Sequence, residues 1–235
     1  MPPALPPPRR VRGRLLLLGL ALLIIAVVIP TVVLPTVIFP PAKPKLDDLG
    51  ELPPFHLTDH TGAALTNDSL RGHVTVVNFI FTRCDTVCPI TSAKMRTIQD
   101  RTNDEPSIKL LSITVDPAHD DVPALAAYAK KQGADDRRWR FARGDIGAIT
   151  ALVDQGMHIG FEDRGGTTPS GAPNIAHDSH FVLVDQDLHI RGYYDSDDWP
   201  RIEAMMKHAR YLTRRGPGRH PAPPPAPPTI AGTPG

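Results

Sequence analysis

The sequence predicts an α/β fold, in which a mixed β-sheet is flanked by helices and preceded by one transmembrane helix. Three observations support this expectation. Residues 15–39 form one long apolar segment, strand-like and helix-like segments alternate over residues 74–153, and a hairpin followed by an amphipathic helix occupies residues 181–212. Strands separated by helices of about ten residues are typical of layered α/β sheets, and the closing hairpin makes part of the sheet antiparallel.

The apolar segment is long enough to span a bilayer. No charged residue lies between Arg14 and Lys43, and a helix of about 25 residues is about 37 Å long, whereas the hydrocarbon core is about 30 Å thick. The arginines before the segment place the N-terminus in the cytoplasm. A cleavable signal peptide is an alternative, but no small-residue cleavage site follows. We therefore expect a single-pass inner-membrane protein whose C-terminal domain lies on the periplasmic, extracytoplasmic side.

Proline and charge mark the domain boundaries. The expected parts are a basic cytoplasmic N-terminus (1–14), the anchor (15–39), a Pro-rich spacer (40–54), a folded domain (55–213) and a disordered Pro-rich tail (214–235). All 25 acidic residues lie between residues 46 and 213, whereas nine of the 26 basic residues lie outside that range. The folded domain is therefore net negative, which argues against nucleic-acid binding and is compatible with a cationic ligand or a basic partner. Acidic residues that serve only solubility produce the same pattern.

The elements of the folded domain follow from local patterns. Residues 74–81 are β-branched and aromatic with almost no polar residue, as in a strand buried on both faces. Pro89 marks a helix start, and the helix continues through Gln99. The remaining expected elements are a strand at 108–115, a helix at 124–131 capped by Asp121, a strand at 139–143, a helix at 146–153, a Gly/Pro/Thr-rich loop at 165–173, paired strands at 181–184 and 190–194, and a helix at 199–212.

The only two cysteines, Cys84 and Cys88, lie four residues apart where the strand at 74–81 turns into a helix. Two thiols at this spacing can share one soft metal ion or form one disulfide. A helix N-terminus carries partial positive charge, which favours the thiolate that binds metals and attacks disulfides. A cysteine pair at such a turn also indicates a thioredoxin-like fold.

Three blocks together resemble one known family. They are residues 78–89 (NFIFTRCDTVCP), residues 112–120 (SITVDPAHD) and residues 177–185 (HDSHFVLVD). In this order they resemble the Sco/SenC/PrrC family of copper-binding proteins that serve cytochrome c oxidase assembly. The spacing of the cysteines alone is a weak signal, but the cysteine block followed by the distant histidine block is a strong one.

The resemblance implies a function and a ligand set. It implies a thioredoxin-like domain that holds one copper ion, Cu(I) or Cu(II), by Cys84, Cys88 and His177. It also implies a metallochaperone, not an enzyme, which delivers copper to the dinuclear copper centre of cytochrome c oxidase subunit II. Another cuproprotein is an alternative acceptor, and other copper chaperones are possible partners. The alternative function is a membrane-anchored thiol:disulfide oxidoreductase whose redox-active disulfide joins Cys84 and Cys88.

The residue chemistry suits copper. Cu(I) favours thiolate sulfur, and imidazole completes a three-coordinate site that accommodates Cu(II). His177 occupies the family position, and His180 lies three residues further on, so in one extended segment only one of them faces the cysteines. Asp116 either positions a copper ligand by contacting it or closes its strand with an Asx-type turn before Pro117, and we favour the turn.

Three positions depart from the family pattern. Asp85 stands where the family often has proline, His180 is an additional histidine, and the loop at 185–188 lacks the usual glycine. The first change concerns the copper site, because a carboxylate beside a thiol raises its pKa. The missing glycine concerns folding and not the metal.

Overall fold

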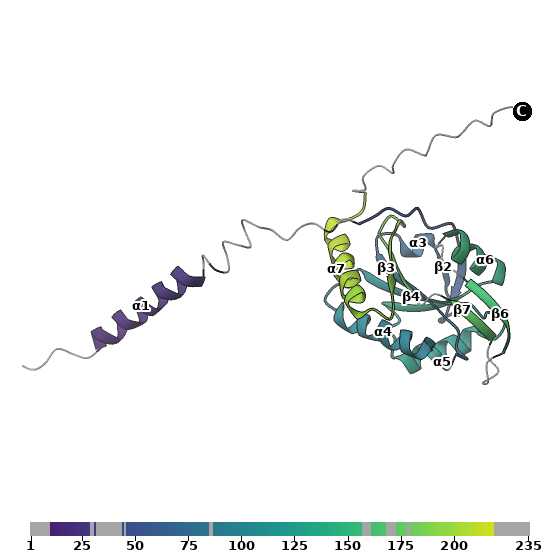
Figure 1. Ribbon diagram of the computed structural model, residues 1–235, viewed down its shortest axis with the longest axis horizontal. Helices are drawn as coiled ribbons and strands as arrows, with labels where there is room; N and C mark the ends of the chain where they lie inside the picture. Colours follow the sequence, from purple (N-terminus) through teal and green to yellow (C-terminus); the bar gives the residue numbers. More distant parts are fainter. Residues whose placement is uncertain are drawn as a thin grey trace, which may run out of the picture. The chain divides into compact units, whose positions relative to one another are not determined.

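The computed structural model describes residues 10–28, 31, 44, 46–84, 87–156, 161–167, 173–177 and 180–218. The chain divides into two units, residues Met1–Lys45 and residues Leu46–Gly235. Figure 1 shows the helix of the first unit and the α/β domain of the second. The two units are described separately below.

The described part of the first unit includes helix α1 (Arg10–Val28). It begins five residues before the predicted anchor and includes three arginines, which are good helix formers. Of the helices in the described segments, none combines the length and the apolar character that a membrane crossing requires. The predicted anchor at 15–39 extends beyond Val28 into residues that lie outside the described ones, so it stays a prediction.

The second unit is built around a seven-stranded mixed sheet with the order β2-β1-β5-β4-β3-β8-β9. Figure 1 labels its strands β2, β3 and β4. Strands β3, β4 and β5 are parallel, β8 is antiparallel to β3, and β9 is antiparallel to β8. The strands are β1 (His56–Asp59), β2 (Ala64–Thr66), β3 (Val74–Ile80), β4 (Ile108–Thr114), β5 (Trp139–Arg143), β8 (His180–Val184) and β9 (Ile190–Asp195). The predicted mixed sheet and its closing hairpin are confirmed.

Helices cover the sheet. They are α3 (Asn67–Leu70), α4 (Val87–Arg101), α5 (Val122–Gln132), α6 (Ile146–Thr150) and α7 (Trp199–Arg215), and a π-helical turn (Ala151–Gly156) follows α6. The predicted cap of α5 is confirmed, because the Asp121 side chain accepts a hydrogen bond from the Ala124 N–H at 2.8 Å. Gly133 ends α5 with a φ of 67°, a left-handed conformation that glycine adopts without strain.

The predicted spacer at 40–54 is wrong over its second half, because residues 49–52 bond to the β9 end of the sheet. The Leu49 N–H donates to the Ile190 carbonyl at 3.0 Å and the Leu52 N–H donates to the Leu188 carbonyl at 2.8 Å. Leu52 is buried in the core. Two prolines after it favour an extended chain, and an extended chain can pair with a strand as readily as it can form a linker.

The predicted loop at 165–173 is also corrected. Strands β6 (Phe161–Thr167) and β7 (Pro173–His177) form a separate two-stranded antiparallel sheet that takes in both ends of the predicted loop. Glycine and proline are poor indicators of a strand, so the composition concealed this hairpin. Strands β1 and β2 and helix α3 were not predicted either.

The core lies on both faces of the central strands. Every residue of β3 is buried, as its apolar sequence predicted. Met95, Met205 and Met206 are buried in the core. The β8–β9 turn replaces the usual glycine with Leu188, whose φ is 73° and whose side chain is fully buried. The Asp185 carboxylate accepts hydrogen bonds from the N–H groups of residues 187 and 189, which hold this turn in shape.

Candidate metal centre

The cysteine-bearing loop leaves the carboxyl end of β3 and is fixed by a buried carboxylate. Asp120 is fully buried, and it accepts a hydrogen bond from the Thr82 N–H at 3.0 Å. The hydroxyls of Thr82 and Thr114 also donate to its oxygens. One side chain from the segment before α5 therefore joins the loop before Cys84 to the end of β4.

A second set of polar contacts fixes the strand beneath this loop. The Ser112 hydroxyl donates to Asn78 Oδ1 at 2.6 Å, and Trp139 Nε1 donates to the Ser112 oxygen at 2.9 Å. These three residues lie on the neighbouring strands β3, β4 and β5. A buried polar network of this kind favours one register of the strands, since any slip leaves its members without partners.

The two cysteines lie in one turn, and both are thiols in this structure. Cys84 is 9% exposed, whereas Cys88, in the first turn of α4, is fully buried. The Cys88 backbone N–H donates to Cys84 Sγ at 3.3 Å. A backbone N–H directed at a sulfur atom favours negative charge there, as the helix start led us to expect.

The electrostatics of the pair make a second negative charge costly. The hydrogen bond to the Cys84 side chain raises the pKa of the Cys88 thiol well above its usual range, and burial and the nearby Asp120 raise it further. Burial also raises the pKa of Tyr128 to about 12, and the two cysteines contribute. A bound cation removes this penalty, because a thiol that coordinates a metal ion is deprotonated. The site therefore fits a soft cation bound by two thiolates.

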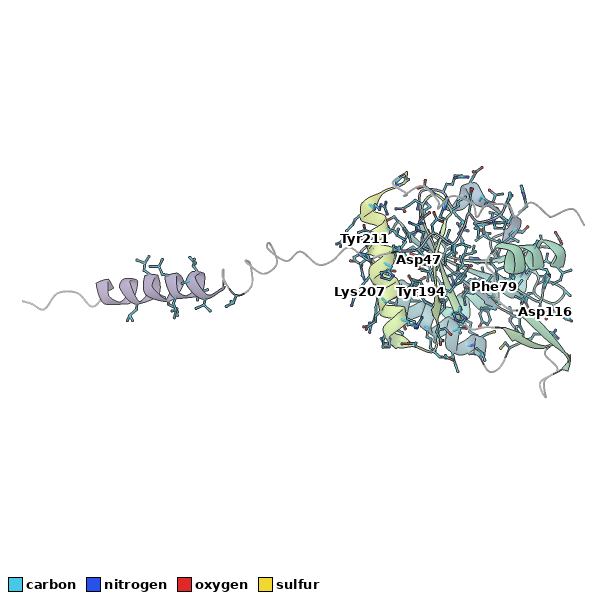
Figure 2. All side chains as sticks on the ribbon, turned by 45° about the horizontal axis from the view of Figure 1, so that its top comes forward. Asp47, Phe79, Asp116, Tyr194, Lys207 and Tyr211 are labelled. Atoms are coloured by element: carbon cyan, nitrogen blue, oxygen red, sulfur yellow. The ribbon has the colours of Figure 1, made fainter. Side chains whose placement is uncertain are left out.

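Asp116 contacts Arg83, the residue beside Cys84. Its described contacts do not include either sulfur atom. Arg83 Nη2 donates to Asp116 Oδ2 at 2.8 Å, and the His119 ring lies 2.8 Å from Oδ1 (Figure 2 labels Asp116). Burial raises the pKa of this carboxyl, but the bonds from His119 and Arg83 outweigh burial and keep the pKa below its usual value. The backbone carbonyl, not the side chain, closes the turn, since it accepts the N–H groups of residues 119 and 120. The Asx-type turn is therefore corrected.

His177 is described only in its backbone. It is the last residue of β7 and pairs with Phe161 of β6, and its side chain lies outside the described part of the chain. His180 begins β8 and pairs with Asp195. The expectation that alternation along one strand separates the two histidines is wrong, because they lie in strands of different sheets. Asp85 also lies outside the described residues.

Within the described residues, no group of three metal-binding side chains occurs. The structure therefore brings Cys84 and Cys88 together, and the assignment of His177 as the third ligand stays a prediction. The sequence did not predict that Thr82, Arg83 and Asp120 hold the cysteine loop in place. Their only sequence signal was their place in the two blocks at 78–89 and 112–120.

The comparison with known families covers most of the second unit. The family described as SCO1/SenC matches residues 45–213. The chain belongs to the SCO1/SenC family. This match includes both cysteines, Asp116, Asp120 and the β7–β8 segment with His177.

Curated relatives of this SCO1/SenC protein come from animals and bacteria. The mitochondrial SCO2 homolog of Danio rerio is 43% identical over 166 residues, which cover 68% of this chain and 57% of the relative. The SCO1 homolog of Bacillus subtilis (strain 168) is 27% identical over 147 residues, which cover 58% of this chain and 69% of the relative. This chain thus spans less than two thirds of the Danio rerio relative.

Solved structures share the fold. A SCO1/SenC family lipoprotein from Bacillus anthracis is 25% identical with a TM-score of 0.63, and the match covers 71% of this chain and 97% of that one. Bradyrhizobium japonicum ScoI, solved with copper bound, is 24% identical with a TM-score of 0.55 and covers 69% of this chain and all of that one. The mixed sheet flanked by helices is therefore the thioredoxin-like Sco fold.

Proposed function

We propose that this protein is a membrane-anchored copper metallochaperone. It receives one copper ion per chain on Cys84, Cys88 and His177 and delivers it to the dinuclear copper centre of cytochrome c oxidase subunit II or to another cuproprotein. The observation that carries the proposal is the pair of adjacent, nearly buried thiols in one turn, whose joint ionisation is costly without a cation. Thiolate sulfur is the ligand that Cu(I) prefers.

The comparisons support this choice of metal and process. A relative from Stutzerimonas stutzeri is named as copper-binding, and ScoI of Bradyrhizobium japonicum was solved with copper. The neighbour BsSco is described as a member of the Sco family of cytochrome c oxidase assembly proteins. For delivery outside the cytoplasm, the predicted anchor at 15–39 places the copper domain on the periplasmic side.

The second candidate function is a thiol:disulfide oxidoreductase that keeps the cysteines of the acceptor reduced. One observation favours it: Cys84 keeps a small exposed fraction of 9% while Cys88 is fully buried, an arrangement that suits attack by one thiol and resolution by the other. A disulfide switch has also been identified in BsSco. This function needs both sulfur atoms but does not need the imidazole of His177.

A copper titration of His177→Ala separates the two functions. We expect the reduced full chain to bind one copper ion, either Cu(I), measured by chelator competition, or Cu(II), measured by absorption. His177→Ala should lower Cu(II) affinity by about hundredfold or more, because a ligand is lost, and should still form the disulfide on oxidation. His180→Ala serves as the matched control and should keep the copper spectrum.

Two results contradict parts of this proposal. An unchanged copper stoichiometry and spectrum in His177→Ala would reject the ligand assignment. A wild-type chain that binds no copper but cycles between dithiol and disulfide would reject the chaperone and support the reductase.

A further inference from the structure

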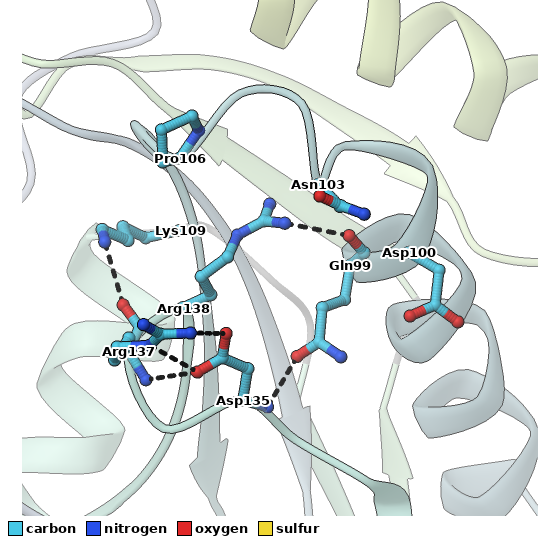
Figure 3. Close-up of a pocket in the computed structure, with 8 residues that line it drawn as sticks. All are labelled: Gln99, Asp100, Asn103, Pro106, Lys109, Asp135, Arg137 and Arg138. Carbon is cyan, nitrogen blue, oxygen red and sulfur yellow. Dashed lines mark hydrogen bonds and ion pairs between the residues drawn. The ribbon is translucent and has the colours of Figure 1, made fainter.

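A cleft of about 610 Å³ opens at the end of the sheet remote from the cysteines. It is lined by residues from the end of α4, the start of β4 and the turn before β5 (Figure 3): Gln99, Asp100, Asn103, Pro106, Lys109, Asp135, Arg137 and Arg138. Because β3 and β4 are parallel and in register, this cleft lies at the amino end of the strands. A seven-residue strand, about 20 Å long, separates it from Cys84.

Both carboxylates of the cleft already have cationic partners. Asp135 accepts the backbone N–H of Arg137 at 3.0 Å and its Nε at 3.3 Å. Asp100 accepts Arg96 Nε at 3.2 Å across one turn of α4. The cation in contact with each acid is therefore another arginine, and their attraction for Arg138 acts over a longer distance.

Two cations of the cleft have no carboxylate partner among the described residues. Arg138 is 8% exposed, and its guanidinium donates to the carbonyls of Gln99 (3.0 Å) and Ile108 (3.3 Å) and to the Thr102 hydroxyl (2.9 Å). Its Nε has no hydrogen-bond partner there. Lys109 Nζ donates only to the Arg137 carbonyl, at 2.9 Å. Figure 3 shows both side chains in the cleft.

Two neighbouring cations without a carboxylate in direct contact are stabilised by an anion that binds both. Burying an unpaired cation costs free energy, and neutral carbonyl acceptors offset only part of it. Burial lowers the pKa of Lys109, and the neighbouring Arg138 lowers it further, so the charges disfavour each other. The Asn103 amide makes no hydrogen bond with a described residue and can add a neutral donor at the rim.

We propose that this cleft binds a phosphate-type oxyanion, held by Lys109 and Arg138 with Asn103 at its rim. A guanidinium and an ammonium together suit the several acceptor oxygens of a phosphoryl group. Inorganic phosphate and the phosphodiester headgroup of a lipid share this chemistry. The site uses neither cysteine, so it is independent of the proposed copper function.

Calorimetric titration of the full chain at constant ionic strength tests this site. Inorganic phosphate is one probe, and glycerophosphoglycerol, the water-soluble headgroup of phosphatidylglycerol, is the other. We expect saturable binding of at least one probe, and Lys109→Gln should weaken it about tenfold, since one charge-assisted contact is lost. Tighter binding of inorganic phosphate identifies a free anion, and tighter binding of the diester identifies a headgroup.

The matched control is Lys207→Gln, which removes the same charge from α7 (labelled in Figure 2), away from the cleft. It should leave the affinity unchanged. Asn103→Asp adds a negative charge at the rim and should weaken binding as much as Lys109→Gln, without removing any contact of the fold. The site is rejected if neither probe saturates, or if Lys207→Gln weakens binding as much as Lys109→Gln.

Discussion

The two ends of the central strands differ in how their charges are neutralised. At the carboxyl end, beside the cysteines, each buried carboxylate has donors: Asp120 accepts from Thr82 and Thr114, and Asp116 accepts from Arg83 and His119. At the amino end, Lys109 and Arg138 donate only to neutral groups in the described part of the chain. The first end is held in place by its own contacts, whereas at the second end the nearby Asp100 and Asp135 bond to other arginines and act on Arg138 only from a longer distance.

The difference separates an end whose charged groups are paired within the fold from an end that we propose binds an anion. Because β3 and β4 are parallel, their amino ends lie at one end of the sheet and their carboxyl ends lie at the other. A substitution at one end should therefore alter the stability or the binding of ligands at that end and leave the other end unaffected. Three substitutions test this separation.

The largest effect is expected for Asp120→Ala at the carboxyl end. The change leaves the Thr82 N–H and two hydroxyls without their acceptor in a buried site, so the free energy of unfolding should fall by about 3 kcal/mol. Urea unfolding measures it, and Asp120→Asn, which keeps one acceptor oxygen, should lose less. A loss below about 1 kcal/mol, as for an ordinary surface change, would show that Asp120 does not fix the cysteine loop.

An intermediate effect is expected for Leu188→Gly at the amino end. The β8–β9 turn lies there, because Val184 pairs with Thr75 at the start of β3. Glycine relieves the positive φ, worth about 1 kcal/mol, but loses a fully buried side chain worth about 3 kcal/mol. Unfolding should be easier by about 2 kcal/mol, with copper affinity unchanged. A change in copper affinity would mean that the two ends are coupled.

The smallest effect is expected for Asp116→Asn, and it depends on pH. The folded pKa of Asp116 lies below the ordinary value of 3.8, so its ion pairs stabilise the protein above about pH 4 and are lost as the pH falls through the lowered pKa. The variant should lose about 1 kcal/mol at about pH 7 and match the wild type at about pH 2 to 3. Melting temperatures across this range measure the difference, and a constant difference would contradict the assignment.

Much of the fold could be predicted because its central elements have strong local patterns. The apolar run of β3, the cap Asp121 and the hairpin of β8 and β9 each have a residue-level cause that acts within a few positions. Strands β1, β6 and β7 could not be predicted, because short strands of mixed polarity owe their pairing to neighbours far along the chain. The left-handed Leu188 breaks the rule that a glycine marks such a turn.

The site was predictable to the extent that it is local. Cys84 and Cys88 lie in one turn, and their spacing in the sequence predicted that the two thiols lie close together. Asp120 reaches Thr82 across 38 positions, and no spacing rule predicts such a contact. The charge of the cleft at the amino end could not be predicted for a related reason. It depends on which aspartates pair with which arginines, and the sequence does not specify these pairs.

The unequal exposure of the two sulfur atoms gives any exchange at this centre a direction. A visiting sulfhydryl, disulfide or chelator from another protein meets the outer sulfur, that of Cys84, first. The inner sulfur, that of Cys88, becomes accessible only after that first bond has formed or after the start of α4 moves.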